Sequence, residues 1–286
     1  MVQKRRVISI SLTALTVLLF LLAMFPFFVV IINSAKESLE IIVNPLSMPK
    51  QWSQMWENVK EIWNNPSIRY PSSVMSSAII TIGSLTAISL FSAMAAWMLV
   101  RTKSRTSTFL FLLFLSGLII PFQVVMFPLV ELFRIIREVT GIPMLRTYHG
   151  IILAYIGFGA PLSVFMFHGF IKSIPLEIEE AATIDGCSKL QTFFCIIVPI
   201  LKPIFMTIII LNGIWIWNDF LLPSLVLGVG QDIQTIPLAI RAFAGSFLKK
   251  WDLIMTAVMM AAIPIVVMFL FVQKHIIKGM VSGSIK

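Results

Sequence analysis

The feature that most constrains this chain is a long apolar run near its N-terminus, residues 7–32, which directly follows the basic cluster Lys4-Arg5-Arg6. A helix rises about 1.5 Å per residue, so this run exceeds the hydrocarbon core of a bilayer, which is about 30 Å thick. A cleaved signal peptide has a shorter apolar region and a small-residue cleavage site. The run therefore predicts an uncleaved membrane span that begins in the cytoplasm.

Further long apolar segments predict an all-α, polytopic membrane protein. Only 12% of the 286 residues are charged, about half the share that is usual in a water-soluble chain. We expect a single transmembrane domain over residues 1–286 with six membrane-spanning helices and both termini in the cytoplasm. The expected spans cover residues 7–32, 72–100, 108–133, 150–170, 204–227 and 253–272.

The basic residues support a membrane role for the chain. The net charge is +9, and Arg101, Lys103 and Arg105 directly follow the second expected span. Lys and Arg gather on the cytoplasmic side of membrane proteins, so these residues mark a cytoplasmic turn. No basic surface with interleaved aromatic residues is evident, and we expect contact with membrane lipid but not with nucleic acid.

The polar loop between the first two spans contains an amphipathic helix pattern. Its apolar residues recur at helical spacing between charged ones. Such a helix either covers the outer surface of its own protein or binds an external partner. The residues of the pattern are Trp52, Met55, Trp56, Val59, Ile62 and Trp63.

The most acidic run of the chain, residues 174–199, lies between the fourth and fifth expected spans. It holds three glutamates and an aspartate within nine residues. Each such charge costs about 2.5 to 3.5 kcal/mol at the centre of a bilayer. This run therefore belongs outside the membrane, on the cytoplasmic side.

Capping residues divide the acidic run into two short helices. Ser173 is a suitable N-cap, and Pro175 is tolerated in a first turn because no partner is needed for its missing N–H. Gly186 ends or turns the first helix. Ser188 caps a second helix that we expect to stop before Pro199. Two capped helices predict a rigid docking segment rather than an ordinary polar loop.

Polar and helix-breaking residues gather from the midplane to the outer half of the third, fourth and fifth spans. Backbone groups freed by Pro or Gly are tolerated in a membrane only where they are buried in protein or line a wet cavity. The pattern suits a pathway for a polar solute, although Pro and Gly are common in membrane helices and Asn218-Asp219 also suits an interfacial anchor. The candidate pathway residues are Pro121, Gln123, Gly157, Asn212, Trp217, Asn218 and Asp219.

No catalytic or metal-binding motif accompanies these features. The chain has no Gly-rich phosphate loop, no His-Glu-x-x-His and no Gly-x-Ser-x-Gly. Cys187 and Cys195 match no metal-ligand spacing, and we expect them to be reduced thiols. The chain is therefore predicted not to be an enzyme.

The acidic run resembles the membrane subunits of bacterial ABC importers. Their motif is Glu-Ala-Ala, three residues, Gly, nine residues, then Ile-x-Leu-Pro. Here it reads Glu180-Ala181-Ala182, Gly186, Ile196, Val198 and Pro199, with Val in place of Leu. Trp217-Asn218-Asp219-Phe220 with Pro223, and the tail from Gln273-Lys274, are similar to the carbohydrate-uptake branch and specifically to the maltose-type second permease.

The resemblance implies a multi-pass sugar permease of the bacterial cytoplasmic membrane that works by alternating access. A separate ATPase dimer would bind ATP and Mg²⁺, so that this chain would bind no cofactor, and would receive the acidic run as a coupling helix. A sister permease would complete the pore, and an extracytoplasmic binding protein would deliver the sugar. The residues assigned to ATPase coupling are Glu179, Glu180, Ala181, Ala182, Asp185, Gly186, Pro199, Gln273 and Lys274.

Three alternatives to this interpretation remain. The solute could be a polyol or glycerol phosphate, because the same branch handles both. An ion-driven secondary transporter would need paired ionisable groups in the membrane, whereas Asp219 has no evident partner in the sequence. A membrane enzyme lacks any candidate site.

Overall fold

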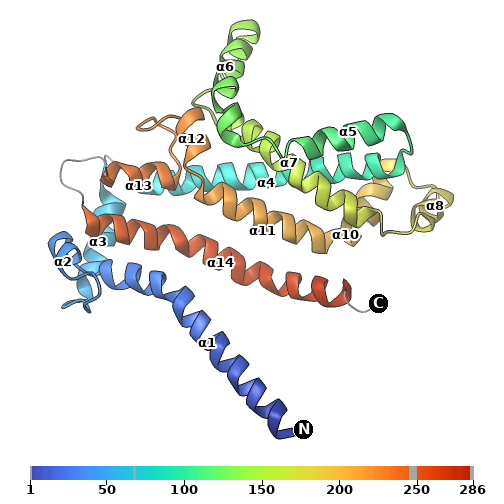
Figure 1. Cartoon of the computed structure of the whole chain (residues 1–286). Helices are drawn as coiled ribbons and strands as arrows, with labels where there is room; N and C mark the ends of the chain where they lie inside the picture. Colours follow the sequence, from blue (N-terminus) through green and yellow to red (C-terminus); the bar gives the residue numbers. More distant parts are fainter. Residues whose placement is uncertain (1, 67–68, 245–249, 284–286) are drawn as a thin grey trace. The chain divides into compact units, whose positions relative to one another are not determined.

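The computed structural model describes residues 2–66, 69–244 and 250–283, and side chains over 9–66, 69–241 and 250–271. Within these ranges the chain is helical and contains no strand, which confirms the all-α prediction. The helices form two compact units (Figure 1). The first unit is Met1–Tyr70 with Ile240–Ile263, and the second is Pro71–Ala239 with Pro264–Lys286.

The first unit is built on α1 (Val2–Asn33), α2 (Ser38–Val43), α3 (Ser53–Asn64) and the first part of α14 (Trp251–Gly283). The backbone carbonyl of Ser34 accepts hydrogen bonds from Asn58 Nδ2 at 3.0 Å and from Thr256 Oγ1 at 3.1 Å, and so joins α1, α3 and α14. The predicted amphipathic helix is confirmed as α3. Ile62 is fully buried, whereas its three tryptophans are at least half-exposed.

The second unit is larger, and α14 also contributes its later part to it. Its other long helices are α4 (Tyr70–Arg101), α5 (Arg105–Ser116), α6 (Phe122–Thr140), α7 (Tyr148–Ile171) and α11 (Lys202–Asn218). Between α7 and α11 come α8 (Glu177–Ile184), α9 (Lys189–Gln191), the π-helix η1 (Thr192–Ile197) and α10 (Val198–Ile200). After α11 come α12 (Leu221–Val226) and α13 (Ile236–Ala244), and the boundary between the two units falls within α13, after Ala239.

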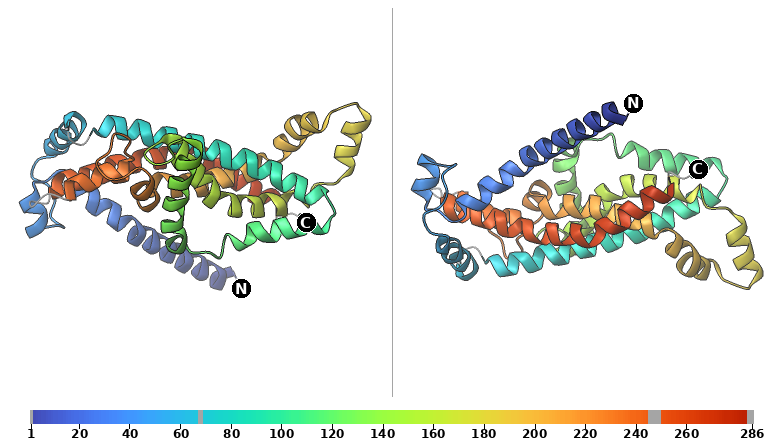
Figure 2. Two further views of the ribbon diagram at one scale, coloured as in Figure 1. Left: turned by 90° about the horizontal axis from the view of Figure 1, so that it is seen from above. Right: turned by 90° about the horizontal axis from the view of Figure 1, so that it is seen from below.

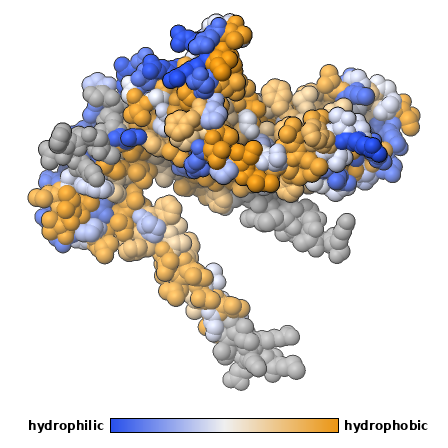
Figure 3. Space-filling view, turned by 45° about the horizontal axis from the view of Figure 1, so that its top comes forward, coloured by the Kyte–Doolittle hydropathy of each residue, from blue (hydrophilic) through white to orange (hydrophobic). Residues whose placement is uncertain are grey.

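Helices α4, α7 and α11 run side by side and enclose two apolar cores (Figures 1 and 2). One core gathers around Ile88 and Tyr155, and the other gathers around Trp97, Phe167 and Phe193. Hydrophobic side chains cover much of the body of this unit, whereas hydrophilic ones gather at the end that carries α8 and around the projecting α6 (Figure 3). This distribution matches a lipid-facing body with hydrophilic regions that lie outside the hydrocarbon core.

Four helices are long and apolar enough to cross a membrane: residues 9–33 of α1, α4, α7 and residues 251–271 of α14. A fifth results if Lys189–Ile200 and Lys202–Asn218, which are bent by 75° to each other, form one span. In the described residues the structure thus gives four or five spans by length and composition, where we predicted six.

The predicted third span, residues 108–133, is not one helix. α5 ends at Ser116, and α6 begins at Phe122 after the extended residue Pro121. Proline lacks an N–H and restricts the residue before it to extended conformations, so the helix breaks at this point. α6 leaves α5 at a steep angle (Figures 1 and 2).

The predicted fifth span, residues 204–227, is likewise shorter than expected. α11 stops at Asn218, and α12 begins at Leu221. The carboxylate of Asp219 accepts a hydrogen bond of 2.9 Å from the Leu221 N–H. The side chain thus satisfies a backbone donor in the first turn of α12, which favours a new helix start over an extension of α11.

Candidate functional site

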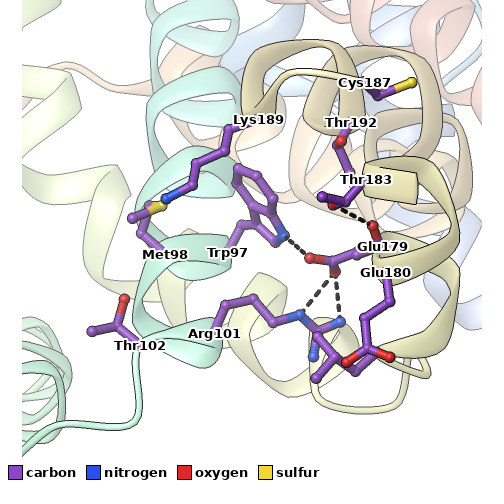
Figure 4. Close-up of a pocket in the computed structure, with 11 residues that line it drawn as sticks. Trp97, Met98, Arg101, Thr102, Glu179, Glu180, Thr183, Cys187, Lys189 and Thr192 are labelled. Atoms are coloured by element: carbon purple, nitrogen blue, oxygen red, sulfur yellow. Dashed lines mark hydrogen bonds and ion pairs between the residues drawn. The ribbon is translucent and has the colours of Figure 1, made fainter. Parts of the chain in front are cut away.

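The candidate site lies where the C-terminal end of α4 meets α8 and α9. A cavity of about 330 Å³ lies between them, with Trp97, Arg101 and Thr102 on one side and Glu179 and residues of α8 and α9 on the other (Figure 4). Two of the three glutamates of the predicted docking segment, Glu179 and Glu180, line this cavity. We therefore describe the segment from its local structure upward.

α8 begins later than its capping pattern predicted. Its N-cap is Leu176, without a side-chain cap, and Glu177, Glu179 and Glu180 occupy its first turn, where the helix dipole favours negative charge. The predicted cap Ser173 instead donates a hydrogen bond of 2.7 Å to the carbonyl of Phe170. Because α7 continues to Ile171, Ser173 serves the C-terminal end of that helix and not the start of the next.

The turn after α8 follows the sequence prediction. Gly186 has φ +83°, in the left-handed region that favours glycine, and the Cys187 N–H donates to the Ala182 carbonyl at 2.9 Å. Ser188 then forms a capping box with Gln191: Ser188 Oγ accepts from the Gln191 N–H at 3.3 Å, and Gln191 Oε1 accepts from the Ser188 N–H at 2.8 Å. The predicted cap of the second helix is thus confirmed.

The expectation that the second helix stops before Pro199 is wrong. Helical structure continues through η1 into α10, which contains Pro199, and bends only near Leu201. A π-helix shifts the hydrogen-bond register by one residue. This shift immediately before Pro199 accommodates a residue that has no N–H to donate.

The adjacent glutamates Glu179 and Glu180 face opposite environments. Glu179 is only 8% exposed, and its carboxylate accepts from Arg101 Nε at 2.8 Å and from Trp97 Nε1 at 3.0 Å (Figure 4). A second Arg101 nitrogen lies 2.8 Å from the same carboxylate and donates to the Ile174 carbonyl at 3.1 Å. Glu180 is exposed. Successive helical residues are rotated by about 100°, which explains the difference.

The solvent-facing surface of the segment is small, acidic and partly apolar. Ala181, Asp185 and Gly186 are exposed, whereas Ala182 is buried against the rest of the unit. Ile184 is 86% exposed, which our sequence analysis did not single out. The signal available was an isolated isoleucine between two polar residues of the acidic run.

The remaining coupling candidates, Pro199, Gln273 and Lys274, are outside α8 in the sequence. Pro199 is exposed on α10. The side chains of Gln273 and Lys274 lie outside the described residues. Cys187 and Cys195 are free thiols, and the described residues hold no group of ligands suited to a metal ion.

The predicted pathway residues make different contacts in the described structure. Asn212 is buried, and its amide donates to Ser163 Oγ at 3.2 Å, which joins α11 to α7. Trp217 lines a separate apolar cavity of about 170 Å³ together with Gly213 and Met268. Asn218 donates to the Ile214 carbonyl within its own helix. The exposed residues of this set are Pro121, Gln123, Gly157 and Asn218.

Asp219 does have a partner, which the sequence did not reveal. The hydroxyl of Tyr155 on α7 donates to Asp219 Oδ2 at 3.1 Å. A tyrosine hydroxyl satisfies one carboxylate oxygen but supplies no positive charge. The pair therefore does not provide the oppositely charged partner expected of an ion-coupling site.

Comparison with known proteins gives a consistent result. The family described as binding-protein-dependent transport system inner membrane component matches residues 80–282. The chain is 37% identical to a probable starch degradation products transport system permease of Thermoanaerobacterium thermosulfurigenes, over 99% of each chain. It is 36% identical to a melibiose/raffinose/stachyose import permease of Bacillus subtilis, over 81% of each.

A solved structure shows the same fold. It is a bacterial ABC transporter involved in the import of the acidic polysaccharide alginate, with a TM-score of 0.74, 18% identity and coverage of 94% of this chain and 96% of that chain. Together with the motif from Glu180 to Pro199, these matches confirm the resemblance. The chain belongs to the inner membrane components of binding-protein-dependent transport systems, and it is a permease subunit of an ABC transporter and not an enzyme.

Proposed function

We propose that this chain is one of two permease subunits of an ATP-driven importer for a mono- or oligosaccharide, and that α8 is its coupling helix. The observation that carries the coupling assignment is the exposed face of α8, where Glu180 and Ile184 stand in water at the hydrophilic end of the second unit. The sugar assignment is supported by the relatives, which are named as permeases for starch products, raffinose-type sugars and multiple sugars.

The surface of α8 suits a cleft on a separate ATPase. Glu180 would pair with a basic group there, and Ile184 would enter an apolar depression. Ala181 allows close approach of the partner backbone. Gly186 and the Ser188 capping box hold the two short helices at a fixed turn, so that force applied to α8 is not lost in a flexible loop.

The rest of the assembly follows from the family. An extracytoplasmic binding protein would deliver sugar, a second permease would complete the pore, and an ATPase dimer would bind ATP and Mg²⁺. We place the chain in the bacterial plasma membrane with both termini in the cytoplasm, because basic residues flank its first two spans. Six passes require that α5 and the start of α6 together make one crossing.

The pathway residues remain part of the proposal. The Asn212–Ser163 contact and the Asp219–Tyr155 contact both lie between α7 and α11. A change in the packing of these two helices would expose polar groups to a solute, as alternating access needs. A polyol or glycerol phosphate is the alternative solute, and an ion-driven carrier is the competing class.

Purification of the tagged chain from mild detergent tests the proposal. We expect an ATPase and a second permease to co-purify, and Glu180→Lys to reduce recovery of the ATPase. Glu177→Lys is the matched control, because Glu177 is also exposed in the first turn of α8. Ion-driven sugar uptake by the purified chain alone, without ATP, would refute the importer.

A further inference from the structure

We propose that Arg101 and Glu179 form a rigid link through which movement of α8 enters α4, so that α4 and not α11 is the first membrane helix to respond to the ATPase. This inference rests on the proposed coupling role of α8. It makes Glu179 a positioning residue, distinct from its neighbour Glu180, which would contact the partner.

The link joins three parts of the chain at one point. Arg101 is the last residue of α4, and its guanidinium holds both the Glu179 carboxylate in α8 and the Ile174 carbonyl in the segment between α7 and α8. Trp97, one turn earlier on α4, donates its indole N–H to the second carboxylate oxygen. Both carboxylate oxygens are therefore bound by α4 (Figure 4).

Burial makes the link stiff. The side chains of Arg101 and Glu179 are only 19% and 10% exposed. Separation of such a pair would leave an uncompensated charge out of water, which is strongly unfavourable. The ring of Trp97 also packs on Phe193 of η1 with centroids 5.4 Å apart, so the surrounding core resists sliding. The end of α4 and α8 are thus expected to move together.

α4 is suited to carry this movement, whereas α11 is not. α4 is a continuous helix of 32 residues that packs in both cores of the unit, through Trp97 in one and Ile88 in the other. The route from α8 into α11 passes through η1 and then through the 75° bend. A π-helical turn and a sharp bend both interrupt the regular α-helical hydrogen-bond ladder, so this route is less continuous than α4.

A movement of α4 would be passed to α7 at Ile88. It packs so closely on α7 that a Cβ at Gly159 would lie 2.6 Å from Ile88 Cδ1 and 3.0 Å from Asn212 Oδ1. A shift of α4 along its axis therefore acts directly on the α7–α11 contact that includes Asn212 and Ser163. Helix α4 therefore connects the Arg101–Glu179 link, at its C-terminal end, with the Asn212–Ser163 contact of the proposed pathway, through its packing on α7.

The experiment measures sugar transported per ATP hydrolysed by the reconstituted complex. We expect Glu179→Gln and Arg101→Gln to assemble with the ATPase but to lower this ratio about fivefold or more, and the exchanged pair Arg101→Glu with Glu179→Arg to recover part of it. Glu177→Gln is the control and should leave the ratio unchanged. An unchanged ratio in Glu179→Gln overturns the proposal.

A distance measurement covers the case in which these variants do not assemble. Spin labels at Thr102→Cys and Glu177→Cys, with Cys187 and Cys195 replaced by Ser, report the separation of the end of α4 from α8 in an otherwise unchanged complex. We expect one narrow distance in both the ATP-free and ATP-trapped states. A distance that changes between these states overturns the rigid link.

The experiments distinguish an error in the proposed docking surface from an error in the proposed Arg101–Glu179 link. If Glu180→Lys leaves ATPase recovery and sugar transport at the wild-type level, the proposed coupling surface is wrong. If Glu180→Lys abolishes both while Glu179→Gln transports normally, the coupling surface stands and only the link is refuted.

Discussion

Tyr155 and Asp219, which are 64 positions apart in the chain, are joined by a hydrogen bond of 3.1 Å from the tyrosine hydroxyl to the carboxylate. Tyr155 is fully buried in α7, and its ring meets Trp215 edge-on with centroids 5.4 Å apart. Asp219 also accepts from the Leu221 N–H. The contact fixes the junction of α11 and α12 against α7.

Tyr155→Phe should therefore destabilise the second unit. The change keeps the ring but removes one donor from a partly buried carboxylate, for which a loss of about 1–3 kcal/mol is expected. Thermal unfolding of the detergent-purified complex measures this loss of stability. Ser224→Ala is the control, because the Ser224 hydroxyl donates only to the Leu221 carbonyl, within the same helix α12. Equal unfolding temperatures for Tyr155→Phe and wild type would contradict the prediction.

Gly159→Ala should also destabilise the second unit, because the added Cβ would overlap Ile88. Overpacking of this kind costs about 1–3 kcal/mol. Gly157→Ala, two residues earlier on α7, is the matched control: a Cβ there meets nothing within 4 Å. We expect Gly157→Ala to be neutral or slightly stabilising in the same unfolding assay. A reversed order of the two variants would show that the α4–α7 packing described above is wrong.

Gly186→Ala tests the turn of the coupling segment. Space around Gly186 is open, so the penalty arises only from φ +83° and amounts to about 1–2 kcal/mol. We expect weaker recovery of the ATPase with Gly186→Ala, and near-normal recovery with Gly186→Asn, because asparagine tolerates this conformation. Identical recovery with both variants would indicate that the turn conformation does not matter for docking.

Lys36 makes the stability of the first unit depend on pH in the alkaline range. The residue is 1% exposed, and its ammonium donates to Asn33 Oδ1 at 3.1 Å and to the Asn44 carbonyl at 3.0 Å. Burial lowers the pKa of Lys36 below its usual value of 10.5, and nearby Glu40 opposes this shift. Lys36 therefore binds its proton more tightly in the unfolded chain than in the folded one. As a result, the free energy of unfolding of the first unit should rise with pH between the lowered pKa and 10.5.

Lys36→Met checks this pH dependence. The variant lacks the titrating group, so the difference in unfolding free energy between wild type and variant should grow in favour of wild type across that window. A difference that is flat or that falls with rising pH would exclude the assignment to Lys36. Limited proteolysis after residues 44–48 gives a second measurement, because the variant also loses the bonds that hold Asn44.

The sequence by itself determined the features that depend on neighbouring residues. The cap at Ser188 and the turn at Gly186 involve groups within five positions, so the local pattern predicts them without knowledge of the fold. The membrane character follows from the long apolar runs, because no packing arrangement hides so much apolar surface in water. Pro121 was visible as a helix breaker, but the direction in which α6 departs was not.

Only the tertiary structure decided which of two adjacent glutamates is buried. Glu179 and Glu180 have the same chemistry and lie in the same helix turn, and the difference between them is set by Arg101, 78 positions earlier. Ser173 was misassigned for a similar reason, since it can serve either the end of α7 or the start of α8. Such choices depend on contacts between distant segments, which exist only once the helices have packed.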